Sequence, residues 1–132
     1  MAFPRGTAIN LELLVEGLLS LENRILFVGV VDSSFKLRHS AFREGTKLHA
    51  DPQVVRNFMT LAPRLAVSEL EKIKPILGPI SSVLVRYEKR LFVFCRLEDY
   101  VIVMGLGTEV STPLPDHIAR IVQTAAGRAR VH

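Results

Sequence analysis

Hydrophobic and polar residues alternate along the first part of the chain with two different periods, and these periods predict a helix and a hairpin. Apolar residues recur every three or four positions over 11–19, which predicts an amphipathic helix capped by Asn10. The run 25–31 is apolar at nearly every position and predicts a strand covered on both faces. After a polar turn at 32–34, apolar and polar residues alternate over 35–41, which predicts a half-exposed strand paired with the first.

A longer helix is predicted in the middle of the chain. Asp51 followed by Pro52 is a typical start, because the aspartate can accept from the first turn and proline costs no hydrogen bond there. Apolar residues then follow one stripe as far as Ile73. Pro63 lies inside this stripe, and we expect it to kink the helix or split it in two, since it removes a backbone donor and clashes with the preceding turn.

The last third of the chain predicts three strands and a closing helix. The strands are expected over 80–87, 91–97 and 100–104, and the second and third are apolar on both faces. Pro113 and Pro115 introduce the final helix. The order is therefore α-β-β-α-β-β-β-α, which predicts an α/β (α+β) domain with a five-stranded antiparallel sheet flanked by helices.

Composition supports one folded domain. The chain has 132 residues, of which 48% are hydrophobic and 23% charged, so we expect a single domain over 1–132 with a core of about 9–126 and a flexible tail over 127–132. Cys95 is the single cysteine, which excludes an intramolecular disulfide and favours the cytoplasm. We expect no signal peptide and no membrane insertion, because no apolar run approaches the ~20 residues that cross a bilayer.

The positive charge is scattered along the chain. The net charge is +4, but acidic residues stand among several of the basic ones, and only the tail 127–132 is positive without relief. Interspersed charge is typical of a solvated surface, so nucleic-acid binding is a less favoured alternative. That alternative would use Arg128, Arg130 and the two strands between Arg86 and Arg96.

No group of residues predicts a catalytic, cofactor or metal site. Cys95 lies between apolar strand residues, which favours a small buried hydrophobe over a nucleophile. The four histidines share no metal-ligand spacing: His39, His49, His117 and His132. The glycines at 105–107 follow a strand without the Gly-Lys-Ser/Thr of a phosphate loop, so we expect a turn there. The chain is therefore predicted not to be an enzyme and to need no cofactor, with a site assembled in space as the alternative.

The hairpin and its surroundings resemble a known family. Residues 27–37 are similar to the glycine-containing strand, acidic turn and second strand of roadblock/LC7 domains, within the profilin-like group. A family of small, uncharacterised archaeal (thaumarchaeal-type) proteins is more similar, over about 21–105. The shared motifs are Gly29 to Asp32, Lys36-Leu37, Arg43 to Gly45, Leu77-Gly78 and Tyr87 to Lys89. The chain departs from roadblock domains at 33–35, Ser-Ser-Phe, where those usually carry Asp-Gly.

The resemblance to roadblock/LC7 domains implies two helices on one face of the sheet and the long helix on the other. It also implies homodimers through the strand 80–87 and the long helix, and a role in regulating or scaffolding small GTPases. The sequence of that strand fits a paired edge, because 80–85 has no charge to guard unpaired backbone groups. A monomer with a loop over this edge is the alternative. The residues expected at the dimer edge are Ile80, Ser82, Val83, Leu84, Val85 and Tyr87.

These observations favour a non-enzymatic regulatory or docking domain that works as a homodimer. A small GTPase or another signalling protein is the expected partner, and this step is an analogy with the fold. The second hypothesis is a small-ligand sensor with a pocket beneath the kinked helix. Its polar lining, which is equally a candidate partner face, would be His39, Arg86 and Tyr87.

Overall fold

A five-stranded antiparallel sheet forms the middle layer of the molecule, as predicted. The computed structural model describes residues 8–46, 51–107 and 114–130. The strands are β1 (Ile25–Val31), β2 (Leu37–Phe42), β3 (Ser82–Arg86), β4 (Leu91–Leu97) and β5 (Tyr100–Leu106). Their order across the sheet is β2-β1-β5-β4-β3, so β2 and β3 lie at the two edges.

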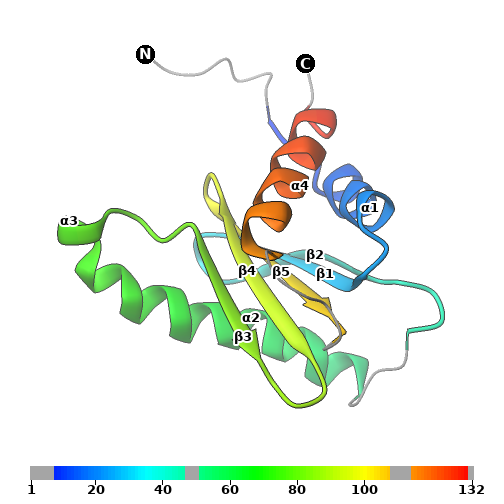
Figure 1. Ribbon diagram of the computed structural model, residues 1–132, viewed down its shortest axis with the longest axis horizontal. Coiled ribbons are helices and arrows are strands. Elements are labelled where there is room, and N and C mark those ends of the chain that lie inside the picture. Colours follow the sequence, from blue (N-terminus) through cyan, green and yellow to red (C-terminus); the bar gives the residue numbers. More distant parts are fainter. Residues whose placement is uncertain (1–7, 47–50, 108–113, 131–132) are drawn as a thin grey trace.

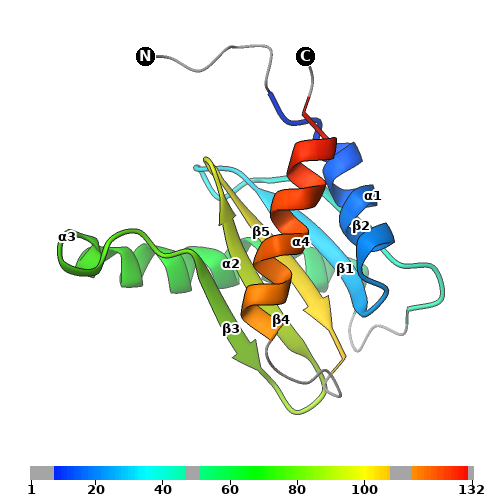
Figure 2. The ribbon, with the colours of Figure 1, turned by 45° about the horizontal axis from the view of Figure 1, so that its top comes forward.

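Helices cover both faces of this sheet. They are α1 (Leu11–Leu21), α2 (Pro52–Leu70), the 3-10 helix η2 (Glu71–Ile73), α3 (Lys74–Leu77) and α4 (Leu114–Arg128). Helices α1 and α4 lie side by side on one face, and α2 crosses the other (Figure 1). The turned view shows α2 passing behind the strands and extending beyond β3 (Figure 2). The predicted element order is confirmed, with η2 and α3 added after the long helix.

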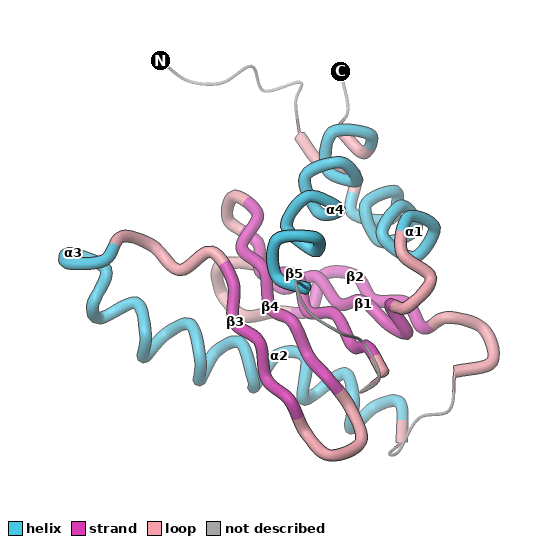
Figure 3. Tube along the Cα trace, in the orientation of Figure 1, coloured by secondary structure: helices cyan, strands magenta, loops and turns pink. Residues whose placement is uncertain are grey.

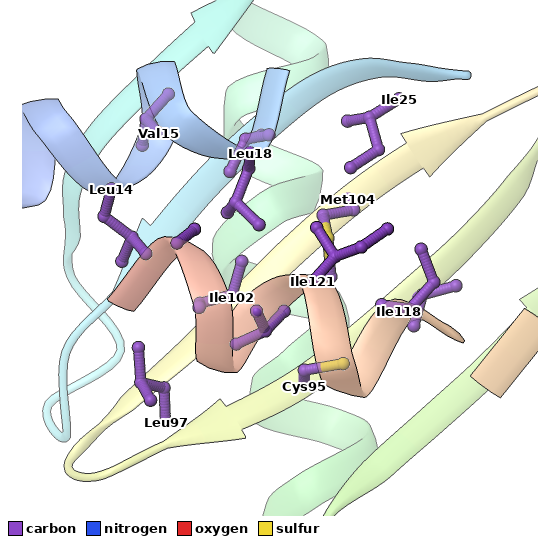
Figure 4. Close-up of a cluster of buried hydrophobic side chains, with 14 of the residues drawn as sticks. Leu14, Val15, Leu18, Ile25, Cys95, Leu97, Ile102, Met104, Ile118 and Ile121 are labelled. Carbon is purple, nitrogen blue, oxygen red and sulfur yellow. The ribbon is translucent and has the colours of Figure 1, made fainter. Parts of the chain in front are cut away.

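The larger core lies between the sheet and the pair α1 and α4 (Figure 4). Leu14 and Leu18 of α1 are fully buried there, and Ile118 of α4 packs over the sheet beside them. Ile102 and Met104 of β5 supply the floor of this cluster. Since each such side chain removes apolar area from water, this layer carries most of the hydrophobic stabilisation of the domain.

Polar contacts fix both ends of α1. Asn10 caps it as predicted, since its Oδ1 accepts from the Leu13 N–H at 3.1 Å. At the other end, the Arg43 guanidinium donates to the carbonyl oxygens of Leu19 at 2.6 Å, Glu22 at 3.0 Å and Ile25 at 2.8 Å. Carbonyls at the end of a helix lack partners within it, so this arginine joins the end of α1 to the start of β1.

The two ends of the described chain meet beside α1. Ile9 and Arg130 form an antiparallel bridge, and the Asn10 N–H donates to the Ala129 carbonyl oxygen at 2.8 Å. Ala129 is fully buried. The predicted flexible tail of 127–132 therefore starts within α4 and stays packed on the domain as far as residue 130, while its last two residues lie outside the described ones.

Helix α2 begins as predicted and ends at Leu70, three residues before the expected end of its apolar stripe at Ile73. Asp51 caps it, because its carboxylate accepts from the Gln53 N–H at 2.8 Å. The helix continues through Pro63 as far as Leu70, so it is not split at the proline. Pro63 is buried, and its packing offsets the hydrogen bond that its missing N–H removes.

Two glycines let neighbouring groups approach this side of the sheet closely. A Cβ at Gly29 would lie 2.6 Å from the Met59 Sδ of α2. A Cβ at Gly105 would lie 2.2 Å from Cζ of Phe27. Gly105 lies inside β5, so the prediction that the strand ends at 104 and turns at the glycines is wrong. The glycine makes room for an aromatic ring on the neighbouring strand.

The β1–β2 turn is longer than predicted. Phe35 was expected in the second strand but lies in the turn with φ 59, and β2 starts at Leu37. The cause is Asp32, whose Oδ1 accepts from the Ser34 N–H at 2.8 Å and the Lys36 N–H at 3.0 Å. These bonds hold the turn closed around a residue in the left-handed region, where glycine is more usual.

Candidate functional site

Strand β3 is the outermost strand at one edge, and no described segment pairs with its outer side. The Ser81 carbonyl oxygen accepts from the Arg96 N–H at 2.9 Å, and the Tyr87 N–H donates to the Arg90 carbonyl oxygen at 2.8 Å. Odd-numbered residues therefore bond to β4. Because antiparallel strands alternate, the residues between them direct their backbone groups outward, with Leu84 at the centre of the strand.

The side chains of the predicted edge residues divide between the two faces of the sheet. Val83 and Val85 are half-buried and pack beneath α2. Ser82 and Leu84 are exposed on the opposite face, and Leu84 keeps 39% of its surface accessible. Tyr87 follows the strand and is 50% exposed. Residues 80–85 include no charged side chain, so this part of the edge carries no charge that would oppose pairing with another strand.

An open apolar groove of about 490 Å³ runs between β3 and α2. Its two helix leucines, Leu61 and Leu65, are 55% and 61% exposed. The lining residues are Phe58, Leu61, Ala62, Leu65, Ala66, Val85, Tyr87 and Phe94. A groove with this lining offers apolar contact to a partner surface and few polar groups for a reaction.

Packed aromatic rings support one end of this groove. The Phe58 and Phe92 ring centroids are 4.5 Å apart, and the Tyr87 ring stands edge-on to both, at 6.2 and 5.7 Å. Phe27 continues the row at 5.7 Å from Phe92. Rings in such offset and edge-to-face arrangements stabilise one another, so this end of the groove is preformed.

The predicted polar lining of a ligand pocket is divided between the two edges of the sheet. His39 lies on β2, whereas Arg86 ends β3 at the opposite edge. Tyr87 lies next to Arg86 and lines the groove. The structure therefore brings Tyr87 to the groove and places His39 away from it.

A buried carboxylate, that of Glu22, forms a polar cluster at the end of α1, and no pattern in the sequence indicated it. Glu22 has a side chain only 7% exposed. Its Oε1 accepts from Arg24 Nε at 2.6 Å, and its Oε2 accepts from Arg24 Nη2 at 2.8 Å. His117 Nε2 of α4 lies 2.9 Å from the same Oε2.

These contacts fix the charge of Glu22. The hydrogen bonds from Arg24 lower the pKa of the Glu22 carboxyl from 4.5 to about 2; the His117 contact acts in the same direction, and burial opposes both. The group is therefore ionised at neutral pH and unsuited to donate a proton. It joins the end of α1 to α4, which is a structural role.

Other candidate chemistry is absent from the parts of the chain that the structure describes. No group of three or more His, Cys, Asp or Glu residues there could hold a metal ion. Cys95 is buried under α4 (Figure 4), and burial raises the pKa of its thiol to about 11, so the thiol is protonated. No helix among the described residues is long and apolar enough to cross a membrane.

A second, polar cavity of about 370 Å³ lies between the β1–β2 and β4–β5 turns. Two of its carboxylates already have arginine partners: Asp32 with Arg38 at 3.3 Å, and Glu98 with Arg130 at 3.2 Å. Their charges are therefore compensated within the domain, and the cavity presents no concentrated charge to a ligand.

Comparison with known proteins identifies the fold. No family model matches the sequence, and no curated protein matches it. A roadblock/LC7 domain from Streptomyces avermitilis matches the structure with a TM-score of 0.65 and 13% identity, over 87% of this chain and 90% of that one. The gliding protein MglB from Thermus thermophilus matches with a TM-score of 0.69 and 10% identity, over 98% and 93%.

A third structure, of MglB in a tetrameric arrangement, matches with a TM-score of 0.64 and 11% identity, over 98% of this chain and 96% of that one. Together these similarities show that the chain has the roadblock/LC7 fold, which the hairpin motif predicted. The resemblance to archaeal proteins stays a prediction.

Proposed function

We propose that this chain is a non-enzymatic docking domain of the cytoplasm that works as a homodimer, joined along β3, and regulates or scaffolds a small GTPase or another signalling protein. The observation that carries this proposal is an edge strand that has no charged side chain before Arg86 and lies beside an apolar groove. One solved structure with the same fold, of MglB, has a tetrameric arrangement, and this supports the expectation that the present chain associates with itself.

The pairing of two β3 strands has one symmetric register at the centre of the strand. The outward-directed backbone groups of Leu84 would meet those of the second Leu84 across a twofold axis. The sheet would then continue across both copies. The exposed groove leucines, Leu61 and Leu65, would lie next to the join and would become covered.

Sedimentation velocity over a wide concentration range tests the dimer. Leu84→Pro removes an outward N–H while it leaves the bonds of odd-numbered residues to β4 in place, so we expect a folded monomer. Leu84→Ala is the matched control, because it shortens the same side chain and keeps the N–H. A dimer that survives Leu84→Pro unchanged would show that the copies do not meet along β3.

Co-purification from native lysate at low and high salt tests the partner. We expect a small GTPase or another signalling protein to stay bound to the wild-type chain at both salts. Leu61→Glu with Leu65→Glu should weaken the dimer, because these leucines would lie next to the join, and should release the partner with it. Leu13→Glu on α1, also an exposed leucine, should do neither. Recovery of the domain alone, or of nucleic acid that high salt removes, contradicts the signalling role.

A small-ligand sensor is the second candidate, and the groove is the observation that favours it. Its volume of about 490 Å³ suits a small apolar molecule, and Tyr87 offers a hydroxyl at its wall. A thermal-shift screen with the Leu84→Pro monomer would separate this candidate from a protein interface. Nucleic-acid binding gains no such support, because Arg96 and Arg130 are engaged by Glu71 and Glu98.

A further inference from the structure

The sheet has a second open edge, at β2, on the side away from β3 (Figure 3). Among the described residues, no segment pairs with the outer side of this strand. The Arg43 N–H donates to the Leu26 carbonyl oxygen of β1 at 2.7 Å, so odd-numbered residues of β2 bond to β1 from His39 onward. Ser40 and Phe42 therefore direct their backbone N–H and C=O groups away from the sheet.

The two open edges differ in charge. Residues 80–85 at the β3 edge include no charged side chain, whereas 36–43 contain Lys36, Arg38 and Arg43 and no acidic residue. Lys36 is exposed, and the Arg38 side chain keeps 58% of its surface accessible. Arg43 turns inward and donates to backbone carbonyls, so its charge lies behind the strand.

Helix α2 adds a further cation to the β2 edge. Arg56 Cζ lies 5.3 Å from the centroid of the Phe42 ring, a cation–π contact that holds the guanidinium beside the strand. Of the surrounding carboxylates, Asp32 accepts from its own turn and is 18% exposed, Glu44 is exposed, and Asp51 caps α2. The cations outnumber the carboxylates, so this edge presents an excess of positive charge.

A cationic edge selects the kind of strand that can pair with it. Like charges opposite one another destabilise a strand pair, so β2 of a second copy is disfavoured here and acidic side chains are favoured. The outward groups of Ser40 and Phe42 include both donors and acceptors. The phosphates of a DNA backbone can only accept, whereas a peptide backbone in extended form offers both.

Both faces of the sheet offer side chains to such a strand, because its own side chains would point alternately to the two faces. On the face that carries α2 it would meet Phe42 and Arg56. On the face that carries α1 it would meet Ala41 and the half-buried His39. His39, which lies far from the groove at β3, thus has a place on a surface of its own.

We propose that the β2 edge binds an extended acidic segment of a partner protein, which adds to the sheet as a sixth strand. An antiparallel strand would exchange about four backbone hydrogen bonds with Ser40 and Phe42. In the proposed homodimer both β2 edges would lie at the ends away from the β3 join. The two proposals are therefore independent, and either can fail alone.

A labelled synthetic peptide of alternating glutamate and valine, about as long as β2, is the probe. Its binding is measured by fluorescence anisotropy to the wild-type chain and to the Leu84→Pro chain, in which the β3 edge is blocked. The control peptide carries lysine in place of each glutamate. We expect the acidic peptide to bind both chains, with a dissociation constant on the order of tenfold lower than that of the lysine peptide.

Two substitutions place the binding at β2. Ser40→Pro removes an outward N–H and leaves the bonds of His39 and Ala41 to β1 in place, so it should weaken binding on the order of tenfold. Ser40→Ala is the matched control, because it keeps the N–H, and should bind like the wild type. Lys36→Glu changes only an exposed side chain, and should weaken the acidic peptide and strengthen the lysine peptide.

The outcomes decide the proposal without reference to the dimer. Absence of binding, equal binding of the two peptides, or binding that both Ser40→Pro and Lys36→Glu leave unchanged overturns it. Backbone amide NMR gives a direct readout for the wild-type chain. Signals of Ser40 and Phe42 that shift on addition of the acidic peptide support strand addition at β2. Shifts at Leu84 with those two signals unchanged overturn it.

Discussion

Replacing Glu22 by glutamine measures how strongly the buried carboxylate holds α4 to the rest of the domain. The bonds from Arg24 and His117 keep its pKa at about 2 in the folded chain, against 4.5 for an unperturbed carboxyl. At about 1.4 kcal/mol per pH unit, this difference corresponds to roughly 3 kcal/mol. The folded pKa is the lower one, so this stabilisation is complete above pH 4.5 and is lost as the pH falls toward 2.

Urea unfolding followed by circular dichroism, at pH values from 5 to 2, gives the free energy of unfolding for each variant. Between these limits the wild-type chain should lose roughly 3 kcal/mol more than Glu22→Gln, because glutamine cannot titrate. Glu16→Gln is the matched control: its carboxylate is exposed on the same helix, and this variant should follow the wild type. Parallel curves for Glu22→Gln and the wild type would refute the reasoning, since the carboxylate would then contribute nothing through its charge.

Two further predictions follow from the packing of the sheet. Gly105→Ala should lower the free energy of unfolding by about 1–3 kcal/mol, because its Cβ would meet the Phe27 ring at 2.2 Å. Gly127→Ala, whose Cβ would have nothing within 4 Å, should not lower it. Equal effects of the two substitutions in urea unfolding would show that the ring moves aside. The Cys95 thiol, with its pKa raised to about 11 by burial, should react with a disulfide reagent at pH 8 only after unfolding, and a native chain that reacts like a free thiol would contradict this.

The order of elements could be predicted because each one carries its own local signals. Asn10 and Asp51 cap the helices that they were expected to cap, and the apolar runs 25–31 and 91–97 are the central strands. Errors arose where tertiary contacts decide the local structure. Gly105 continues a strand because a ring from β1 needs its space, which no pattern within the strand could indicate.

The candidate site was predictable in part for the same reason. The uncharged strand 80–85 could be recognised as an edge from its own sequence. Leu70 could not be recognised as exposed, because its spacing on α2 is that of a core residue and only the width of the sheet uncovers it. Glu22 and His117 are 95 residues apart, so their contact depends on how α4 returns to α1.

The bridge between Ile9 and Arg130 closes the described chain into a loop at one corner of the molecule. In a closed loop the packing of the layers does not depend on where the chain starts. A short linker across this corner, with new ends opened beside the exposed Gly45, would give a circular permutant that keeps the strand order and both helical layers. The β3 edge and the apolar groove beside it would then be presented by a chain that begins and ends between β2 and α2.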